Sequence, residues 1–113
     1  MGVEEFLQQV LEAARSHAWI KRTDIQRGRQ RVKIRLWIND TFVDVYFNAE
    51  RQIISYAYIE GEERLFGANN MHMGWHVHPF GQQEKHDPSE LITIGEFLIA
   101  LEKELRARGK ISD

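Results

Sequence analysis

Four of the five histidines in this 113-residue chain fall within fifteen residues, at His72, His76, His78 and His86. A histidine side chain changes charge near neutral pH, transfers protons and is the commonest protein ligand for metals. We therefore expect the chemistry of this protein to lie in that segment.

His76 and His78 are two residues apart, so in an extended segment both side chains point to the same side. Trp75 and Val77 then point to the other side, toward the core. One imidazole can remove a proton from a nucleophilic hydroxyl, such as the 2′-hydroxyl of RNA, while the other protonates the leaving oxygen. This interpretation assigns His76, His78 and His86 as catalytic residues of a small endoribonuclease and requires no cofactor.

The same three histidines also form a set of metal ligands. Neutral imidazoles bind zinc well in tetrahedral sites, so His76, His78 and His86 predict a divalent metal site, with zinc or manganese, as the alternative to acid/base chemistry. Further candidate ligands are His72, Asp87 and Glu90. A third interpretation is a histidine-rich metal-binding or interaction module without catalysis. A fourth gives the histidines only structural hydrogen bonds, which is the role that we expect for His17.

Basic residues are concentrated between positions 21 and 35. This segment holds seven of the fifteen lysines and arginines and a single acid, although the net charge of the chain is −2. Five of the cations occupy alternate positions: Arg27, Arg29, Arg31, Lys33 and Arg35. If residues 27–38 form one strand, all five line up on the face opposite its apolar residues. Such a row predicts contact with a nucleic-acid backbone, with RNA as the expected partner.

Aromatic side chains near this row are suited to stacking on bases. They are Trp37, Tyr46, Tyr56 and Tyr58. The alternative is an ordinary solvated face whose cations pair with acidic neighbours such as Asp44.

The hydrophobic pattern predicts a helix at each end of the chain. Apolar residues recur at helical spacing over residues 3–14 and again over 97–105. A capping box formed by Thr93 and Glu96 precedes the second run, and Gly109 is placed to end it.

Between the helices, the pattern predicts strands at 27–38, 41–48 and 52–59, followed by a hairpin into 64–66. We therefore expect an α+β fold: an N-terminal helix, an antiparallel β-meander and a C-terminal helix, with both helices on one sheet face. The segment 67–93 is expected to be a long connection that carries the histidines.

Length and composition indicate one domain, residues 1–113. The absence of cysteine excludes disulfides, thiolate metal sites and a cysteine nucleophile, and it is compatible with a cytoplasmic protein. No stretch approaches the ~20 apolar residues of a membrane span, so no membrane contact is expected. The exposed edge strand of a small meander favours a homodimer.

Short motifs over most of the chain resemble the TumE-like toxins of prokaryotic toxin/antitoxin modules. The motifs are residues 31–36, Tyr46-Phe-Asn48, Ile54-Ser-Tyr56, Leu65-Phe66, Asn69-Asn70, and His76-Val-His78 with His86. The family tends to have Asp-Asn in place of Asn69-Asn70 and His-His-Lys-His in place of His76-Val-His78. The resemblance implies a cytoplasmic growth-inhibiting protein that acts on RNA and is neutralised by a cognate antitoxin protein.

A second resemblance concerns residues 74–79, Gly-Trp-His-Val-His-Pro, together with Ser89. They are similar to the His-x-His-Pro and Ser-x-x-Asp pattern of JAB/MPN metalloproteases, although this chain has Ile92 where that pattern has its aspartate ligand. This resemblance implies a zinc-dependent isopeptidase as a further alternative.

Overall fold

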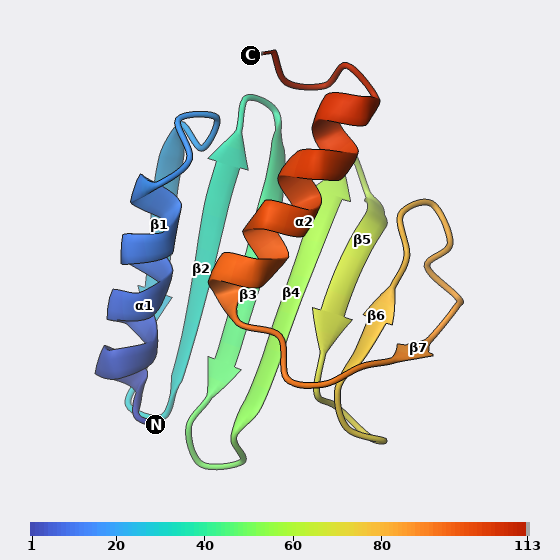
Figure 1. Ribbon diagram of the computed structural model, residues 1–113. Coiled ribbons are helices and arrows are strands. Elements are labelled where there is room, and N and C mark those ends of the chain that lie inside the picture. Colours follow the sequence, from blue (N-terminus) through green and yellow to red (C-terminus); the bar gives the residue numbers. More distant parts are fainter. Residues whose placement is uncertain (113) are drawn as a thin grey trace.

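The computed structural model describes residues 1–112, which form two helices and a seven-stranded antiparallel sheet (Figure 1). In chain order the elements are α1 (Val3–Arg15), β1 (Arg22–Arg27), β2 (Arg31–Ile38), β3 (Thr41–Asn48), β4 (Ile53–Glu60), β5 (Glu63–Asn69), β6 (His76–His78), β7 (Asp87–Pro88) and α2 (Ile94–Ala107). Each strand pairs with the next one along the chain, so the sheet is a meander. The predicted α+β fold is confirmed.

Both helices cover the same face of the sheet, as predicted (Figure 1). Phe6 of α1 stacks on Phe47 of β3 with ring centroids 4.5 Å apart, and Phe97 of α2 lies 5.2 Å from the rings of both Tyr56 and Phe66. These side chains belong to one buried apolar core between the helices and the sheet. The other side of the sheet is not covered by a helix of the described residues, and we call it the open face.

The capping box predicted for the second helix is present. The Thr93 hydroxyl accepts a hydrogen bond from the Glu96 backbone N–H at 3.1 Å, and the Glu96 carboxylate accepts one from the Thr93 N–H at 2.8 Å. At the other end, Gly109 has a φ of 68°, which glycine adopts without steric cost and which ends the helix. None of the described helices is both long enough and apolar enough to cross a membrane.

The prediction of a single strand over residues 27–38 is wrong. The chain turns back at 28–30, where the Gly28 N–H donates to the Arg31 carbonyl at 2.8 Å, and the segment becomes the hairpin of β1 and β2. Arg27 is paired with Val32, whose side chain is buried in the core. Since directly opposed residues of antiparallel strands share a face, Arg27 lies on the helix side of the sheet.

The expected long connection over 67–93 is also more ordered than predicted. Strand β5 continues to Asn69, and the short strands β6 and β7 then extend the sheet. The edge of the sheet opposite β1 is therefore built from the histidine segment itself.

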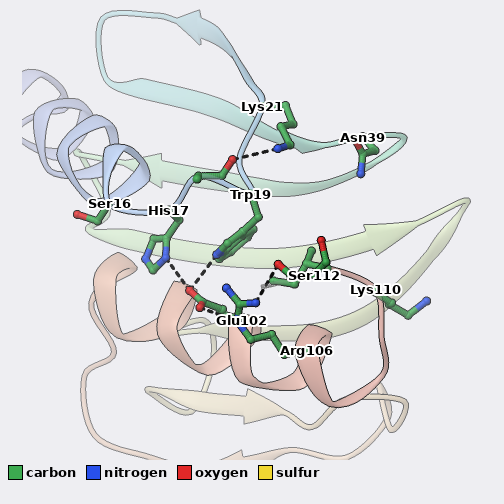
Figure 2. Close-up of a pocket in the computed structure, with 11 residues that line it drawn as sticks. Ser16, His17, Trp19, Lys21, Asn39, Glu102, Arg106, Lys110 and Ser112 are labelled. Atoms are coloured by element: carbon green, nitrogen blue, oxygen red, sulfur yellow. Dashed lines mark hydrogen bonds and ion pairs between the residues drawn. The ribbon is translucent and has the colours of Figure 1, made fainter.

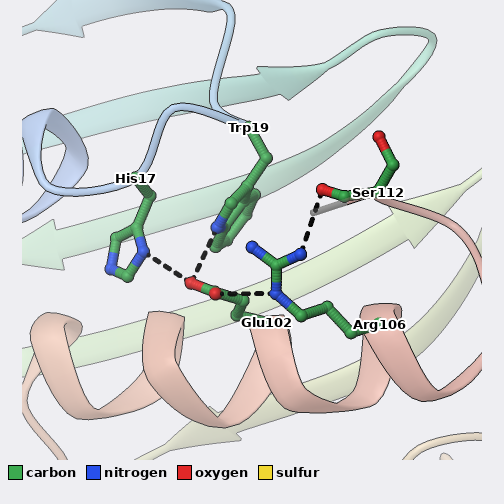
Figure 3. A network of polar contacts seen from close by, with 5 residues as sticks. All are labelled: His17, Trp19, Glu102, Arg106 and Ser112. Carbon is green, nitrogen blue, oxygen red and sulfur yellow. Dashed lines mark hydrogen bonds and ion pairs between the residues drawn. The ribbon is translucent and has the colours of Figure 1, made fainter.

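The end of α1 is joined to α2 by a hydrogen-bond network around one carboxylate (Figures 2 and 3). Glu102 accepts hydrogen bonds from the Trp19 indole N–H and the Arg106 guanidinium, both at 2.9 Å, and its Oε1 lies 2.9 Å from His17 Nδ1. These residues are among those that line a cavity of about 460 Å³ (Figure 2). His17 thus makes a hydrogen bond within the fold, and its assignment as a structural residue stays a prediction.

Candidate metal centre on the open sheet face

Three of the four histidines in the histidine segment come together at the edge of the sheet. His76 and His78 lie on β6, and their ring centroids are 5.0 Å apart. The pairing of Val77 with Asp87 continues to place His86 beside His78, with ring centroids 4.4 Å apart. One ligand nitrogen from each of the three rings lies within 4.8 Å of the others. We call these residues the histidine cluster.

Backbone carbonyls fix the orientation of two of these rings. His76 Nδ1 lies 3.0 Å from the Gly74 carbonyl oxygen, and His78 Nδ1 lies 2.8 Å from the Gln83 carbonyl oxygen. A carbonyl oxygen only accepts, so Nδ1 must carry the hydrogen in both rings. In the neutral form, Nε2 is then left with a free lone pair. This arrangement, with Nδ1–H donated to a carbonyl, is characteristic of histidines that bind a metal through Nε2.

The three rings differ in their exposure to solvent. His78 is buried, with 3% of its surface exposed, whereas His76 is half-buried and His86 is exposed. Burial lowers the pKa of His78, and the nearby positive charge of Arg64 lowers it further. At neutral pH this imidazole is therefore uncharged, as a metal ligand must be.

This geometry favours metal binding over a pair of histidines acting as base and acid. Three imidazoles with converging nitrogens, two of which keep a free Nε2 lone pair, match the ligand set of zinc sites with three histidines and one open position. An acid/base pair requires one of the rings to be protonated before the reaction. Burial and the nearby Arg64 oppose protonation of His78, so in such a pair His78 is suited to act as the base and not as the acid.

Other predicted ligands lie outside the histidine cluster. His72 is exposed in the loop between β5 and β6 and has a φ of 63°. Asp87 lies 3.9 Å from Lys85, and neither Asp87 nor Glu90 belongs to the group of converging ligand atoms in the described residues. The cluster therefore consists of histidines alone.

Arg64 on β5 is a residue of this site that the sequence analysis did not identify. Its Nη2 lies 3.5 Å from the Gln83 carbonyl oxygen, the same oxygen that accepts from His78 Nδ1. The register between β4 and β5 shifts at Tyr58 and Ile59, so the side of the sheet on which Arg64 lies does not follow from simple alternation. No sequence signal therefore pointed to it.

The predicted row of five cations is not a row in the structure. Only Arg31, Lys33 and Arg35 lie on β2 with their side chains on the open face. Arg29 lies in the turn between β1 and β2, and Arg27 forms an ion pair with Glu4 of α1 on the helix side.

The expectation that some cations pair with acids is confirmed for Arg35. It donates hydrogen bonds of 2.8 and 3.2 Å to Asp44 and lies 3.8 Å from the centre of the Phe42 ring. Within the described residues, Arg31 and Lys33 have no ion-pair partner at 4.0 Å or less. These two side chains are therefore the part of the predicted row that is available to an anion.

Of the four predicted stacking residues, two are on the wrong side of the sheet. Tyr56 and Tyr58 are buried in the core beneath the helices. Trp37 lies on the open face, but the Arg22 guanidinium sits 4.7 Å from its ring and its indole N–H donates to Asp24 at 2.9 Å. Tyr46, directly opposite Lys33, is half-buried on the open face.

The histidine cluster and the cations of β2 lie on the same face but at opposite ends of it. The register connects Lys33 to His76 through directly opposed residues on the three strands between them: Tyr46, Ser55 and Asn69. Four strand spacings separate β2 from β6, roughly 19 Å at ~4.8 Å each. The β2 cations therefore cannot touch a phosphate that is bound at the histidines.

Comparisons with family models, with curated proteins and with solved structures find no match for this chain. The chemistry of the histidine cluster and of the open face is therefore what bears on function.

Proposed function

We propose that the protein is a divalent-metal-dependent ribonuclease whose metal ligands are His76, His78 and His86. The observation that carries the proposal is the convergence of three imidazoles within 4.8 Å, with the tautomer of two of them fixed by backbone carbonyls. These residues would hold a zinc or manganese ion, which would supply Lewis-acid chemistry toward a phosphate ester and water.

The histidine cluster has the openness that a hydrolytic centre requires. His78 is buried and anchored to Gln83, so it holds the site to the sheet, whereas His86 is exposed on the solvent side. Substrate can therefore approach from the open face without displacing a helix.

RNA is the substrate class that the rest of the open face supports. Lys33 and His76 are the two ends of one cross-strand row, and the residues between them are an aromatic and two polar side chains without negative charge. A single strand lying along this row would place phosphates near Lys33 and Arg31 and bases near Tyr46.

The resemblance to TumE-like toxins extends this proposal to a cellular role. In the role that this resemblance implies, the protein would inhibit growth by cleaving RNA and would be neutralised by a cognate antitoxin protein. Induced expression of the parent chain should then arrest growth, expression of His86→Ala should not, and expression of His72→Ala should arrest growth like the parent.

The direct test is cleavage of RNA by the purified protein. We expect cleavage that is lost in EDTA, is restored by zinc or manganese, and falls by at least about 100-fold in His86→Ala, because the loss of one of three ligands removes most of the metal affinity. His86 is exposed, so this variant should keep the fold. His72→Ala is the matched control and should cleave like the parent.

Two results would favour the alternatives. Cleavage that survives EDTA but is lost in His76→Ala would replace the metal with the acid/base pair of His76 and His78. Absence of cleavage in all conditions, with zinc binding that depends on His86, would leave a metal-binding module without nuclease activity. The isopeptidase alternative has less support, because no carboxylate of the described residues joins the histidine cluster.

A further inference from the structure

Arg64 holds its guanidinium beside the histidine cluster without satisfying its own hydrogen bonds. The Nε of Arg64 is buried and has no hydrogen-bond partner. Its Nη2 reaches only the Gln83 carbonyl oxygen, at 3.5 Å. A buried donor that lacks an acceptor is costly, so such a group calls for an explanation.

The absence of a side chain at Gly67 leaves room on the sheet for the stem of Arg64. A Cβ at Gly67 would come within 3.0 Å of the Tyr56 carbonyl oxygen and 3.5 Å of the Arg64 Cδ. Gly67 is directly opposite His78. The arginine stem therefore passes across a position without a side chain, in the direction of the histidine cluster.

Arg64 and His78 are bound to the same oxygen atom. The distance between Arg64 Nη2 and His78 Nδ1 cannot exceed the sum of 2.8 and 3.5 Å, because both nitrogens contact the Gln83 carbonyl oxygen. A fixed positive charge this close to a cation-binding site opposes metal binding unless a bound anion offsets it.

We propose that Arg64 is a phosphate-positioning residue, which holds one oxygen of a phosphate group while the metal ion at the histidine cluster holds another. This inference rests on the proposed metal site and deepens it. A phosphate brings the negative charge that offsets two neighbouring cations, and the planar guanidinium supplies several donors for phosphate oxygens. Because Nε is buried, the donors for such a group are those of the Nη nitrogens.

The test uses cobalt(II) as a spectroscopic substitute for zinc and inorganic phosphate as the probe. Visible absorption of the cobalt-loaded protein measures metal affinity, and its change on titration with phosphate measures phosphate affinity. Three variants are compared with the parent chain: Arg64→Gln, Arg64→Lys and Arg22→Gln.

We expect Arg64→Gln to weaken phosphate binding by about tenfold or more, because a charge-assisted hydrogen bond is lost. The same variant should bind cobalt at least as tightly as the parent, because a neighbouring positive charge has been removed. A merely structural arginine would weaken both affinities. Arg64→Lys should recover part of the phosphate affinity, and Arg22→Gln, far across the open face, should change neither affinity.

Two outcomes would overturn the inference in different ways. If cobalt binds and phosphate affinity is equal in Arg64→Gln and the parent, Arg64 has no role in binding phosphate although the metal site stands. If cobalt binds to neither protein, the metal site fails, and the positioning role of Arg64 fails with it.

Discussion

Glu102 of α2 makes hydrogen bonds with His17 and Trp19, which lie in the segment that follows α1 (Figure 3). Three side chains, from Trp19, Arg106 and His17, share its two oxygens. The hydrogen bond from Trp19, followed by those from Arg106 and His17, lowers the pKa of Glu102 from 4.5 to about 2. The folded state therefore stabilises the charged form of this carboxylate relative to the protonated form.

This lowered pKa predicts how stability depends on pH. A carboxyl group with a lower pKa in the folded state stabilises the fold fully above about pH 4.5, and this contribution is lost as pH falls toward about 2. Glu102→Gln should reduce the free energy of unfolding by about 1–2 kcal/mol at neutral pH, a value that allows for partial exposure of the carboxylate. The difference from the parent should shrink below pH 4.5. Urea unfolding between pH 2 and 7 measures it.

Glu104→Gln is the matched control for this prediction. Glu104 lies on the same helix, but its carboxylate pairs with a single exposed side chain, that of Arg108. The control should cost less than about 0.5 kcal/mol at any pH. An equal loss of stability in both variants, or a difference that does not change with pH, would contradict the assigned role of Glu102.

Among the residues of the candidate site, the histidines could be predicted from the sequence, whereas the neighbouring Arg64 could not. His76 and His78 share a side because side chains alternate along any strand, which needs no knowledge of the fold. His86 joins them only through the pairing of β6 with β7, and β7 has two residues and no strand-like pattern. Arg64 was missed because a bulge, set by packing, decides which way it points.

The capping box of Thr93 and Glu96 stabilises the N-terminus of α2. Thr93→Ala removes the hydroxyl that accepts from the Glu96 N–H, so it should cost about 1 kcal/mol of stability. Ser89→Ala, four residues earlier, removes a hydroxyl that donates only to the Glu90 carbonyl at 3.0 Å and should change stability by a few tenths of a kcal/mol. Thermal unfolding of the two variants compares these losses. Equal losses would mean that the capping box does not stabilise the helix.

Elements with a clear period were predicted, and those that depend on partner strands were not. The two helices and strands β3 and β4 have apolar residues at regular spacing, and each is present where the pattern indicated. The β1–β2 hairpin was read as one strand because cations continue at alternate positions through its turn at 28–30. Arg27 is directly opposite Val32, and an even number of residues lies between them, so alternate positions before and after the turn lie on opposite faces of the sheet.

Across the whole molecule, positive and negative side chains are divided unequally between the two faces of the sheet. The open face has strand cations Arg22, Arg31, Lys33, Arg35 and Arg64 against two acids, Asp24 and Asp44. The helix side instead pairs its cations with acids, as Arg27 does with Glu4. The neutral-to-acidic overall charge of −2 therefore coexists with one basic face. A polyanion bound at the histidine cluster would extend across the sheet toward β2.

This distribution of charge predicts which arginine contributes to RNA affinity. Arg31→Gln and Arg27→Gln each remove one positive charge, and the two residues are only four positions apart, but their side chains lie on opposite faces. Affinity for a single-stranded RNA is measured between 50 and 300 mM salt, with the histidine cluster metal-free so that no cleavage occurs. The slope of log K against log salt should fall by about 0.7 for Arg31→Gln, the value for one lost phosphate contact on a single strand. Arg27→Gln should leave the slope unchanged. If Arg27→Gln lowers the slope as much as Arg31→Gln does, binding responds to net charge alone, and the open face is not where the RNA lies.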